Sequence, residues 1–484
     1  MALPLIIQGG MGVAVSGWRL ARTVSSAGQL GVVSGTLLPV VLARRLQLGD
    51  LDGDLRRAFD AFPDRGVVDR VLARYLVPGG KDPKSPFAPV PMPSAAPSRL
   101  WLELAVLANF AEVWLAKSGH EGRVGVNLLE KIQVATLASV YGAMLAGVDV
   151  VLMGAGIPRA IPGVLDKFAA GEAAEIALDV HGPAADGAEP VRLRFDPADF
   201  FGGVAPALRR PLFLAIVGSA ALATTLARKS TGRVDGFVVE SAAAGGHNAP
   251  PRGGGAPGPD GQPVYGPRDE PELEKFRALG LPFWLAGERA SPERLAEARA
   301  LGAAGVQIGT AFAFCAESGL AETHKRHACE ASREGTTRLF TDPLASPTGF
   351  PFKTLDLPGV LSRLGNTSRP PRRCDIGYLR QPFRRPNGEL GYRCPAEPAE
   401  DFAGKGGDTQ DCEGRMCLCN GLLAAVGLGQ VSRADVSRDT PQVEPAIITA
   451  GAEAAGIARF LRAGEESYSA RAVLDHVLGA GANV

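Results

Sequence analysis

Eight short apolar runs recur along the 484-residue chain, and each is followed by a stretch with helical spacing. Strands that alternate with helices in this way form parallel βα units, because a parallel crossover needs a connection about as long as a helix. The runs are nearly continuous in Val, Ile and Leu, as expected for strands buried on both faces. They span residues 3–8, 30–34, 124–128, 148–153, 212–217, 234–241, 281–286 and 306–310.

This repeat predicts an α/β fold in which eight parallel strands close into a TIM (β/α)8 barrel. A doubly wound open sheet is the alternative, but the regular units and the glycine-rich exits of the last two strands favour closure. We expect residues 1–335 to form the barrel, with a mostly helical insertion at 51–122. Residues 336–484 then form a smaller C-terminal region with clustered cysteines and closing helices at 457–461 and 470–478.

Three connecting stretches carry further expectations. Residues 176–180 and 191–195 have the composition of a small hairpin within a second insertion. Residues 248–267 are too rich in Gly and Pro for regular structure and resemble a lid or binding loop. Residues 340–353 are expected to be a proline-rich connector.

The charge balance limits the class of partner. Lys plus Arg and Asp plus Glu are equal at 51 each, so no net field draws the chain to nucleic acid or to an anionic membrane. We therefore expect a small-molecule substrate. The N-terminus lacks the features of a signal peptide, and the most apolar run, 211–227, is shorter than the ~20 residues of a spanning helix. These features predict a cytoplasmic protein, with a homodimer as one possible assembly.

The exits of the last three strands carry the chemistry. The sixth strand leads into Ala244-Gly-Gly-His247, the seventh ends at Gly287, and the eighth ends at Gly309-Thr310. Glycine leaves backbone N–H groups accessible to an anion, and an imidazole can transfer a proton. These exits predict a phosphate cradle beside a proton-transfer group. A loop histidine that caps neighbouring backbone is the simpler interpretation of His247, but its position at a strand exit favours catalysis.

Several motifs, taken together, resemble the nitronate monooxygenase family, formerly called 2-nitropropane dioxygenases, which also includes flavin-dependent enoyl-thioester reductases. They follow the family order over roughly two-thirds of the chain, which a lone glycine motif would not do. The motifs lie at residues 6–12, 26–35, 125–128, 147–151, 154–156, 244–247 and 302–312.

The resemblance implies FMN as cofactor, bound in a TIM barrel that has a smaller second domain. It implies a catalytic role for His247 and flavin contacts from the backbone near the first strand and from an asparagine on the third. It also implies a phosphate site at the last two strand exits. The implied cofactor-binding residues are Gly10, Met11, Asn127, Gly154, Gly246, Gly287, Gly309 and Thr310.

The chain departs from the family pattern at several positions. Ala243 stands where an acidic residue often precedes the Ala-Gly-Gly-His run. Gly287-Glu288-Arg289 replaces a common Gly-Gly pair, so Arg289 could help to hold the phosphate while Glu288 points away. The insertion at 51–122 and the cysteine-bearing tail are also unlike the short monooxygenases. These departures leave the substrate open.

The C-terminal cysteines allow two interpretations. Cys374, Cys394, Cys417 and Cys419, with Cys412 nearby, could hold zinc or an iron–sulfur centre. Buried thiols that bind no metal are the simpler interpretation, because the Cys417-x-Cys419 spacing is unusual for zinc.

The predicted function is an FMN-dependent monooxygenase that oxidises nitronates or nitroalkanes with dioxygen to a carbonyl compound and nitrite, with His247 as acid/base. One alternative is an NAD(P)H-dependent enoyl-thioester reductase related to fatty-acid or polyketide synthesis. Another is a non-catalytic flavin- or acyl-binding partner of a biosynthetic assembly that docks through residues 51–122.

Overall fold

The structure is a computed structural model that describes residues 3–182, 189–254, 256–362, 374–431 and 443–479. Eight strands form one fully parallel sheet in the order β1-β11-β10-β8-β7-β4-β3-β2. They are β1 (Ile6–Gln8), β2 (Gly31–Ser34), β3 (Val124–Leu129), β4 (Val150–Gly154), β7 (Leu212–Val217), β8 (Gly236–Glu240), β10 (Phe283–Ala286) and β11 (Gly305–Ile308).

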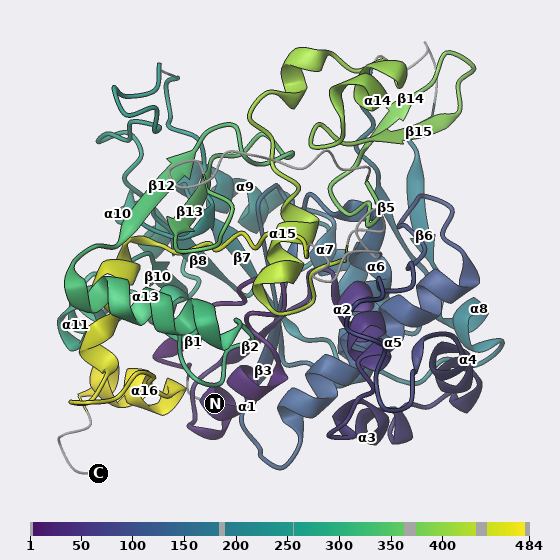
Figure 1. Ribbon diagram of the computed structural model, residues 1–484, viewed down its shortest axis with the longest axis horizontal. Coiled ribbons are helices and arrows are strands. Elements are labelled where there is room, and N and C mark those ends of the chain that lie inside the picture. The colour runs from purple at the N-terminus through teal and green to yellow at the C-terminus, as the bar shows by residue number, and fades with distance from the viewer. Residues whose placement is uncertain (1–2, 183–188, 255, 363–373, 432–442, 480–484) are drawn as a thin grey trace.

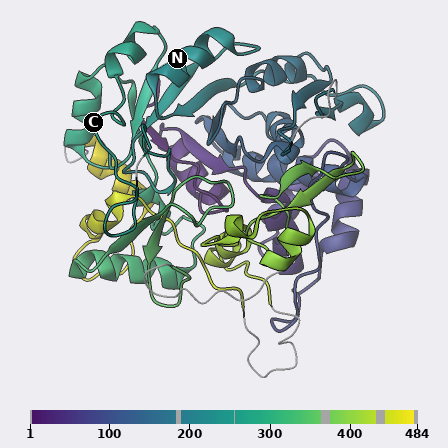
Figure 2. The same cartoon turned by 90° about the horizontal axis from the view of Figure 1, so that it is seen from above.

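The two ends of this sheet meet. Ile7 of β1 forms a parallel bridge with Leu30, whose carbonyl accepts a 2.9 Å hydrogen bond from the Gln8 amide. The sheet is therefore curled into a ring, and helices surround it (Figures 1 and 2). The predicted TIM barrel is confirmed, including all eight strand positions to within a few residues.

Helices follow the strands as the sequence predicts. Serine side chains begin several of them: Ser98, Ser219 and Ser291 accept hydrogen bonds from backbone amides in the first helical turns. The helices beside the barrel are α1 (Trp18–Ser26), α5 (Arg99–Lys117), α6 (Gln133–Leu145), α7 (Ile161–Ala169), α9 (Ala220–Lys229), α10 (Leu273–Ala278), α11 (Pro292–Ala300), α12 (Thr310–Ala313) and α13 (Glu322–Glu334).

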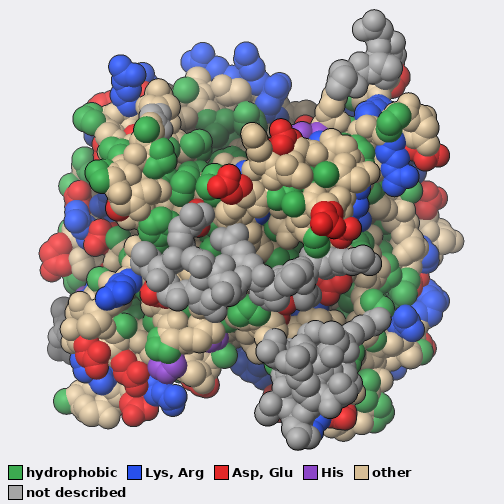
Figure 3. Space-filling view, turned by 45° about the horizontal axis from the view of Figure 1, so that its top comes forward, with side chains coloured by type: hydrophobic (Ala, Val, Ile, Leu, Met, Phe, Trp, Pro, Cys, Tyr) green, Lys and Arg blue, Asp and Glu red, His purple; other side chains and the backbone are tan. Residues whose placement is uncertain are grey.

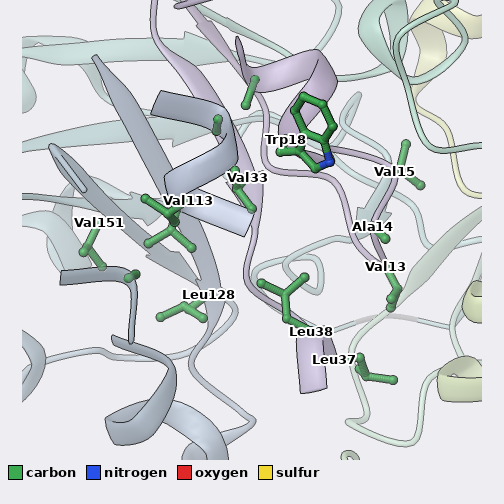
Figure 4. Packing of buried hydrophobic residues seen from close by; sticks show 14 of the residues in the cluster. Val13, Ala14, Val15, Trp18, Val33, Leu37, Leu38, Val113, Leu128 and Val151 are labelled. Carbon is green, nitrogen blue, oxygen red and sulfur yellow. The ribbon is translucent and has the colours of Figure 1, made fainter. Parts of the chain in front are cut away.

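Helix α5 is part of the barrel's outer layer and not of a separate insertion. It contacts α1 and α6, the helices that follow the first and third strands, as well as α2 (Leu38–Gln47). Figure 4 shows its Val113 among buried side chains that include Val33 of β2 and Leu128 of β3. The extra elements between β2 and β3 are therefore α2, α3 (Asp54–Asp60) and α4 (Arg65–Tyr75).

The barrel interior is filled by side chains. Alternate residues of each strand point inward, so a second apolar cluster forms inside the ring. It comprises Ile7, Leu30, Val32, Val150, Leu152, Leu214, Val238, Trp284 and Ala286. A ligand can therefore bind only at the mouth of the barrel, which is formed by the carboxyl ends of the strands.

The stretch at 340–353 is not a simple connector, which corrects the prediction. It contains β12 (Arg338–Asp342) and the start of β13 (Phe352–Asp356), which pair antiparallel with each other. The segment β9 (Gly246–His247) adds a third strand to β13. The prolines misled the prediction because they lie in the turn between the strands, where they remove no ladder hydrogen bond.

The predicted hairpin between β4 and β7 is confirmed as β5 (Ala174–Ala177) and β6 (Arg192–Phe195), and α8 (Pro197–Phe201) follows it. The expected closing helix at 457–461 overlaps the end of a longer 3-10 helix, η3 (Ala452–Phe460), and that at 470–478 is α16 (Ala470–Leu478).

Between β13 and these closing helices lie β14 (Gln381–Arg384), β15 (Leu390–Arg393), α14 (Ala399–Gly404), η1 (Thr409–Cys412) and α15 (Leu418–Ala425). Residues 363–373 and 432–442 of the expected C-terminal region lie outside the described residues. The division of the chain at residue 335 stays a prediction.

Acidic and basic side chains intermix on the face shown in Figure 3, in keeping with the zero net charge. None of the helices in the described part of the chain is both long enough and apolar enough to cross a membrane.

Candidate active site at the barrel mouth

Three polar residues point into the mouth of the barrel. Asn127 lies beside Leu152 in the strand register, Glu240 beside Ala286, and Gln307 beside Ile7. The neighbours named here belong to the inner apolar cluster, and residues in register on adjacent strands share a face. Asn127, Glu240 and Gln307 therefore converge from β3, β8 and β11.

Asn127 is positioned by the loop that follows β1. Its Nδ2 donates a 3.1 Å hydrogen bond to the Gly10 carbonyl. A side chain at residue 10 would not fit, because an added Cβ would lie 2.3 Å from the Asn127 Cβ. The Asn127 Oδ1 is buried and has no hydrogen-bond partner. A buried amide oxygen without a partner is costly, so this atom is suited to accept from a bound ligand.

Gln307 on β11 is a second such polar residue. Strand β11 neighbours β1 on the side away from β2 and β3. Its Oε1 is also buried without a partner. The sequence analysis missed this residue, although a polar side chain at an inward position of a barrel strand was the signal that could have found it.

His247 is held by the small sheet. It pairs with Phe352 of β13, and the two ring centroids are 4.9 Å apart. Its Nε2 lies 2.7 Å from the Ser346 Oγ, which is in turn 2.8 Å from the Thr348 Oγ1. Burial lowers the pKa of His247 to about 4, so the imidazole is neutral at physiological pH.

Glu240 is a second titratable group that the sequence analysis missed. The residue keeps some solvent exposure, yet burial of its carboxyl raises the pKa to about 7, against a smaller opposing effect of Lys353. Lys353 pairs with Gly246 in β13, and its Nζ donates to the Ala242 carbonyl. Burial lowers the pKa of Lys353, while the charge of Glu240 works against that shift. Glu240 lies seven residues before His247, upstream of the position at which an acid was expected.

The predicted phosphate residues lie at adjacent strand exits. Gly287 adopts a φ of +98°, and an added Cβ there would lie 2.2 Å from the Ser241 Oγ. Gly309 precedes Thr310, whose Oγ1 accepts a 2.8 Å hydrogen bond from the Gly451 amide. The Thr310 hydroxyl hydrogen remains able to donate to an anion.

Arg289 lies at the same edge, as its sequence position suggested. Its Nη1 contacts the Glu297 Oε2 at 3.1 Å, while its Nε is buried without a partner. A guanidinium with an unused donor suits a phosphate.

Gly154 and Gly246 also lie at strand exits. A Cβ on Gly154 would approach the Ile216 Cβ to 2.9 Å, and Gly246 has a φ of +77°. Met11 lies between the first and last exits, because a Cβ on Gly309 would lie 3.6 Å from its Sδ. The residues predicted to bind the cofactor thus all lie at the carboxyl ends of barrel strands or in the loops that follow them.

Comparison with protein-family models indicates which kind of protein this segment resembles. Residues 208–344 match the model of the family described as nitronate monooxygenase. This segment runs from β7 to β12 and contains Glu240, His247, Gly287 and Gly309. Over this segment the chain is similar to the nitronate monooxygenase family. This similarity supports a flavin-dependent oxidoreductase.

The solved structures that are similar to this chain have low sequence identity to it. FabK from Thermotoga maritima is 16% identical with a TM-score of 0.44, covering 99% of this chain and 92% of that chain. Nitroalkane oxidase from Streptomyces ansochromogenes is 17% identical with a TM-score of 0.37, covering 73% and 77%.

The enoyl reductase domain of MlnA, from the macrolactin biosynthesis cluster of Bacillus amyloliquefaciens, is 12% identical with a TM-score of 0.35, covering 74% and 64%. No curated protein sequence matches this chain. The similarities are too low for the activities of those proteins to be transferred to it.

The polar groups at the barrel mouth fit a flavin. The unpartnered oxygens of Asn127 and Gln307 match the donors of a flavin ring, and the absence of a side chain at Gly10 permits close approach. The exits at Gly309 and Arg289 offer donors to a phosphate.

The predicted metal ligands, Cys374, Cys394, Cys417 and Cys419, lie near one another in the C-terminal region. The pKa of Cys419 is influenced by the charges of Cys417, Cys374 and Cys394. Among the described residues, however, no group of three or more Cys, His, Asp or Glu side chains is arranged to hold a metal ion, so the predicted zinc or iron–sulfur centre is not supported.

Proposed function

We propose that this chain is an FMN-dependent oxidoreductase that converts nitronates and dioxygen into a carbonyl compound and nitrite. The observation that supports it is a neutral, half-buried imidazole, His247, at the mouth of the barrel, in a segment that matches the nitronate monooxygenase family model. A nitronate is an anion, and a neutral imidazole can donate a hydrogen bond to it; with a nitroalkane, it can accept the proton from carbon and become imidazolium. Two nitronates and one dioxygen give two carbonyl compounds and two nitrites, so each oxygen atom of dioxygen ends in one carbonyl group.

We assign the binding roles as follows. Asn127, Gln307 and the backbone of Gly10 and Met11 hold the flavin ring, with Gly154 and Gly246 leaving space for it. Gly287, Gly309, Thr310 and Arg289 hold the phosphate. When bound, FMN supplies the two-electron acceptor. Ser346 fixes the ring of His247 through its Nε2 contact.

Oxygen uptake tests the proposal. Purified protein loaded with FMN is given propyl-2-nitronate, and dioxygen consumption and nitrite release are measured together. We expect nitrite to form in step with nitronate loss, and His247→Ala to lower kcat/KM by about 10²–10⁴-fold with FMN retained. Turnover that persists in the variant, or no turnover of any small nitronate, contradicts the proposal.

A reductase acting on enoyl thioesters is the second candidate, and Glu240 is the observation that favours it. A carboxyl with a pKa of about 7 can deliver a proton at neutral pH, as reduction of an alkene requires and nitronate oxidation does not. Anaerobic mixing separates the two reactions. Rapid loss of the flavin absorbance with NADH or NADPH alone favours the reductase, whereas loss with the nitronate alone favours the monooxygenase.

A further inference from the structure

A segment near the C-terminus folds back onto the exits of the barrel strands. It comprises residues 449–460, includes η3, and packs beside α12 and α13 (yellow in Figure 1). The Gly451 amide donates a 2.8 Å hydrogen bond to the Thr310 Oγ1, directly after β11. The next amide, of Ala452, donates to the Ala243 carbonyl at 2.9 Å, in the loop after β8. We call residues 449–460 the C-terminal strap.

The same strap holds the turn that follows β10. The Glu453 side chain is buried, its Oε2 accepts a 3.0 Å hydrogen bond from the Ala290 amide, and its Oε1 pairs with the Arg459 guanidinium. The Arg459 Nη2 in turn donates to the Ala290 carbonyl at 3.0 Å. Both polar groups of the Ala290 backbone are therefore fixed by the strap. Ala290 directly follows Gly287 and Arg289 in the chain, two of the residues assigned to the phosphate.

The contact from Gly451 determines how the Thr310 hydroxyl can hydrogen-bond. A backbone amide can only donate, so the Thr310 Oγ1 is the acceptor in this contact. The hydroxyl hydrogen must then point to another acceptor, and the described part of the chain supplies none. An anion beside Gly309 would be such an acceptor, so the strap turns Thr310 into a donor for it.

Backbone lies directly against backbone where the strap meets the loop after β8. A Cβ added to Gly451 would lie 2.6 Å from the Ala243 carbonyl oxygen, and one added to Gly245 would lie 2.5 Å from the Ala450 carbonyl carbon. Neither position has room for a side chain. The hydrogen bonds of the strap to Thr310 and Ala243 therefore depend on glycine at residue 451.

We propose that the C-terminal strap is part of the FMN phosphate site, where it orients the Thr310 hydroxyl and fixes the turn that carries Gly287 and Arg289. This inference rests on the proposed function, which assigns the phosphate to these strand exits. The strap lies outside the segment 208–344 that matches the family model, so that similarity assigns it no role.

Flavin titration separates a phosphate role from a general role in folding, because riboflavin has the ring of FMN but no phosphate. The full chain, freed of flavin, is titrated with each compound while flavin fluorescence is followed. We expect the unmodified protein to bind FMN at least about tenfold more tightly than riboflavin. Gly451→Ala should weaken FMN binding about tenfold and riboflavin binding less than about twofold.

Gly404→Ala is the matched control. It adds the same methyl group at a glycine whose added Cβ would have no heavy atom within 4 Å, so it should leave both affinities unchanged. Glu453→Gln tests the second contact, because it removes the charge that pairs with Arg459. It should also weaken FMN binding more than riboflavin binding.

A double variant tests the route through Thr310. Thr310→Val removes the hydroxyl and should weaken FMN binding selectively. If the strap acts by orienting this hydroxyl, Gly451→Ala should weaken FMN binding less in the Thr310→Val background than in the unmodified protein. Effects that multiply fully would refute the orientation of Thr310 by the strap.

Three results would overturn the proposal: equal affinities of the unmodified protein for FMN and riboflavin, equal weakening of both by Gly451→Ala, or no weakening of either. If the variants fail to fold, hydrogen exchange of the unmodified protein decides. The strap amides should then exchange more slowly with saturating FMN than with saturating riboflavin, and equal exchange rules the strap out. Because the readout is binding, a protein that behaves as expected here but oxidises no nitronate would contradict only the proposed reaction.

Discussion

At the scale of single residues, the site is defined by polar atoms that the fold leaves without partners. Asn127 Oδ1 and Gln307 Oε1 are both buried at the barrel mouth and bonded to nothing in the protein. These two oxygens already lose their hydrogen bonds to water when the protein folds. A ligand that donates to them therefore gains a hydrogen bond with little further desolvation cost. Their placement is the strongest sign within the structure that the mouth is built for a polar ring.

The first prediction concerns Asn127. Asn127→Ala should weaken FMN binding by about 10-fold, on the order of 1.4 kcal/mol, because it removes the unpartnered acceptor and the contact to Gly10. Fluorescence titration of the apoprotein with FMN measures this. Asn109→Ala is a matched control, since Asn109 also has a buried, unpartnered Oδ1 but lies on α5. Equal weakening in both variants would show that the effect is structural.

The second prediction concerns the pH dependence of stability at Glu240. Its pKa is raised from 4.5 to about 7 in the folded protein, so between these values the native state holds a proton that the unfolded chain has lost. The stabilisation that protonated Glu240 gives the folded state is therefore fully present below about pH 4.5, and it is lost as pH rises towards 7. Glu240→Gln should raise Tm relative to the unmodified protein at pH 8 more than at pH 5.

Thermal unfolding of the flavin-free protein at a series of pH values checks this prediction. Glu330→Gln, on the exposed face of α13, is the control and should shift Tm little at any pH. A difference between Glu240→Gln and the unmodified protein that does not change with pH would refute the raised pKa.

At the scale of elements, the small sheet of β12, β13 and β9 holds the candidate catalytic residue. His247 lies in the chain 99 residues before its hydroxyl partner Ser346, and the pairing with Phe352 brings the two together. Strand β13, which follows the barrel strands in the chain, thus positions His247, which lies between β8 and β10 in the chain. The predicted connector is, in fact, a support for the active site.

The third prediction tests this support. Phe352 is 2% exposed and packs against the His247 ring, so Phe352→Ala should lower the free energy of unfolding by about 3–5 kcal/mol and also reduce kcat. Phe352→Leu keeps most of the volume and should cost much less of both. Denaturant unfolding and steady-state kinetics provide the two measurements. An active, destabilised Phe352→Ala would show that the sheet contributes stability only.

At the scale of the whole molecule, the segment between β2 and β3 is integrated with the barrel. The Glu112 side chain of α5 is 4% exposed and accepts from the Trp18 amide at 2.9 Å and from the Arg45 Nη1 at 3.0 Å. These contacts join α5 to α1 and α2. One alternative was that residues 51–122 dock to a biosynthetic assembly. Because α5 packs on the barrel, such a surface would have to be formed by the outer helices α3 and α4.

The fourth prediction follows from this integration. Glu112→Ala should lower the free energy of unfolding by about 3 kcal/mol, because it leaves a buried amide and a partly buried guanidinium without their acceptor. Asp60→Ala, which removes a contact to exposed Arg65, should change it by less than about 1 kcal/mol. Denaturant unfolding measures both. Similar small changes in the two variants would mean that α5 is not coupled to the barrel through Glu112.

The amino-acid sequence alone determined the barrel and the strand exits that form its mouth, because apolar periodicity and glycine placement are local properties of the chain. It also placed Gly309 and Thr310 directly after a strand, Asn127 in the second half of one, and His247 in the loop that follows another, all on the side of the mouth. Only the tertiary structure decided which groups meet there. The convergence of Glu240 with Lys353, of His247 with Ser346, and of four distant thiols depends on ring closure and on long-range strand pairing, which no local pattern encodes.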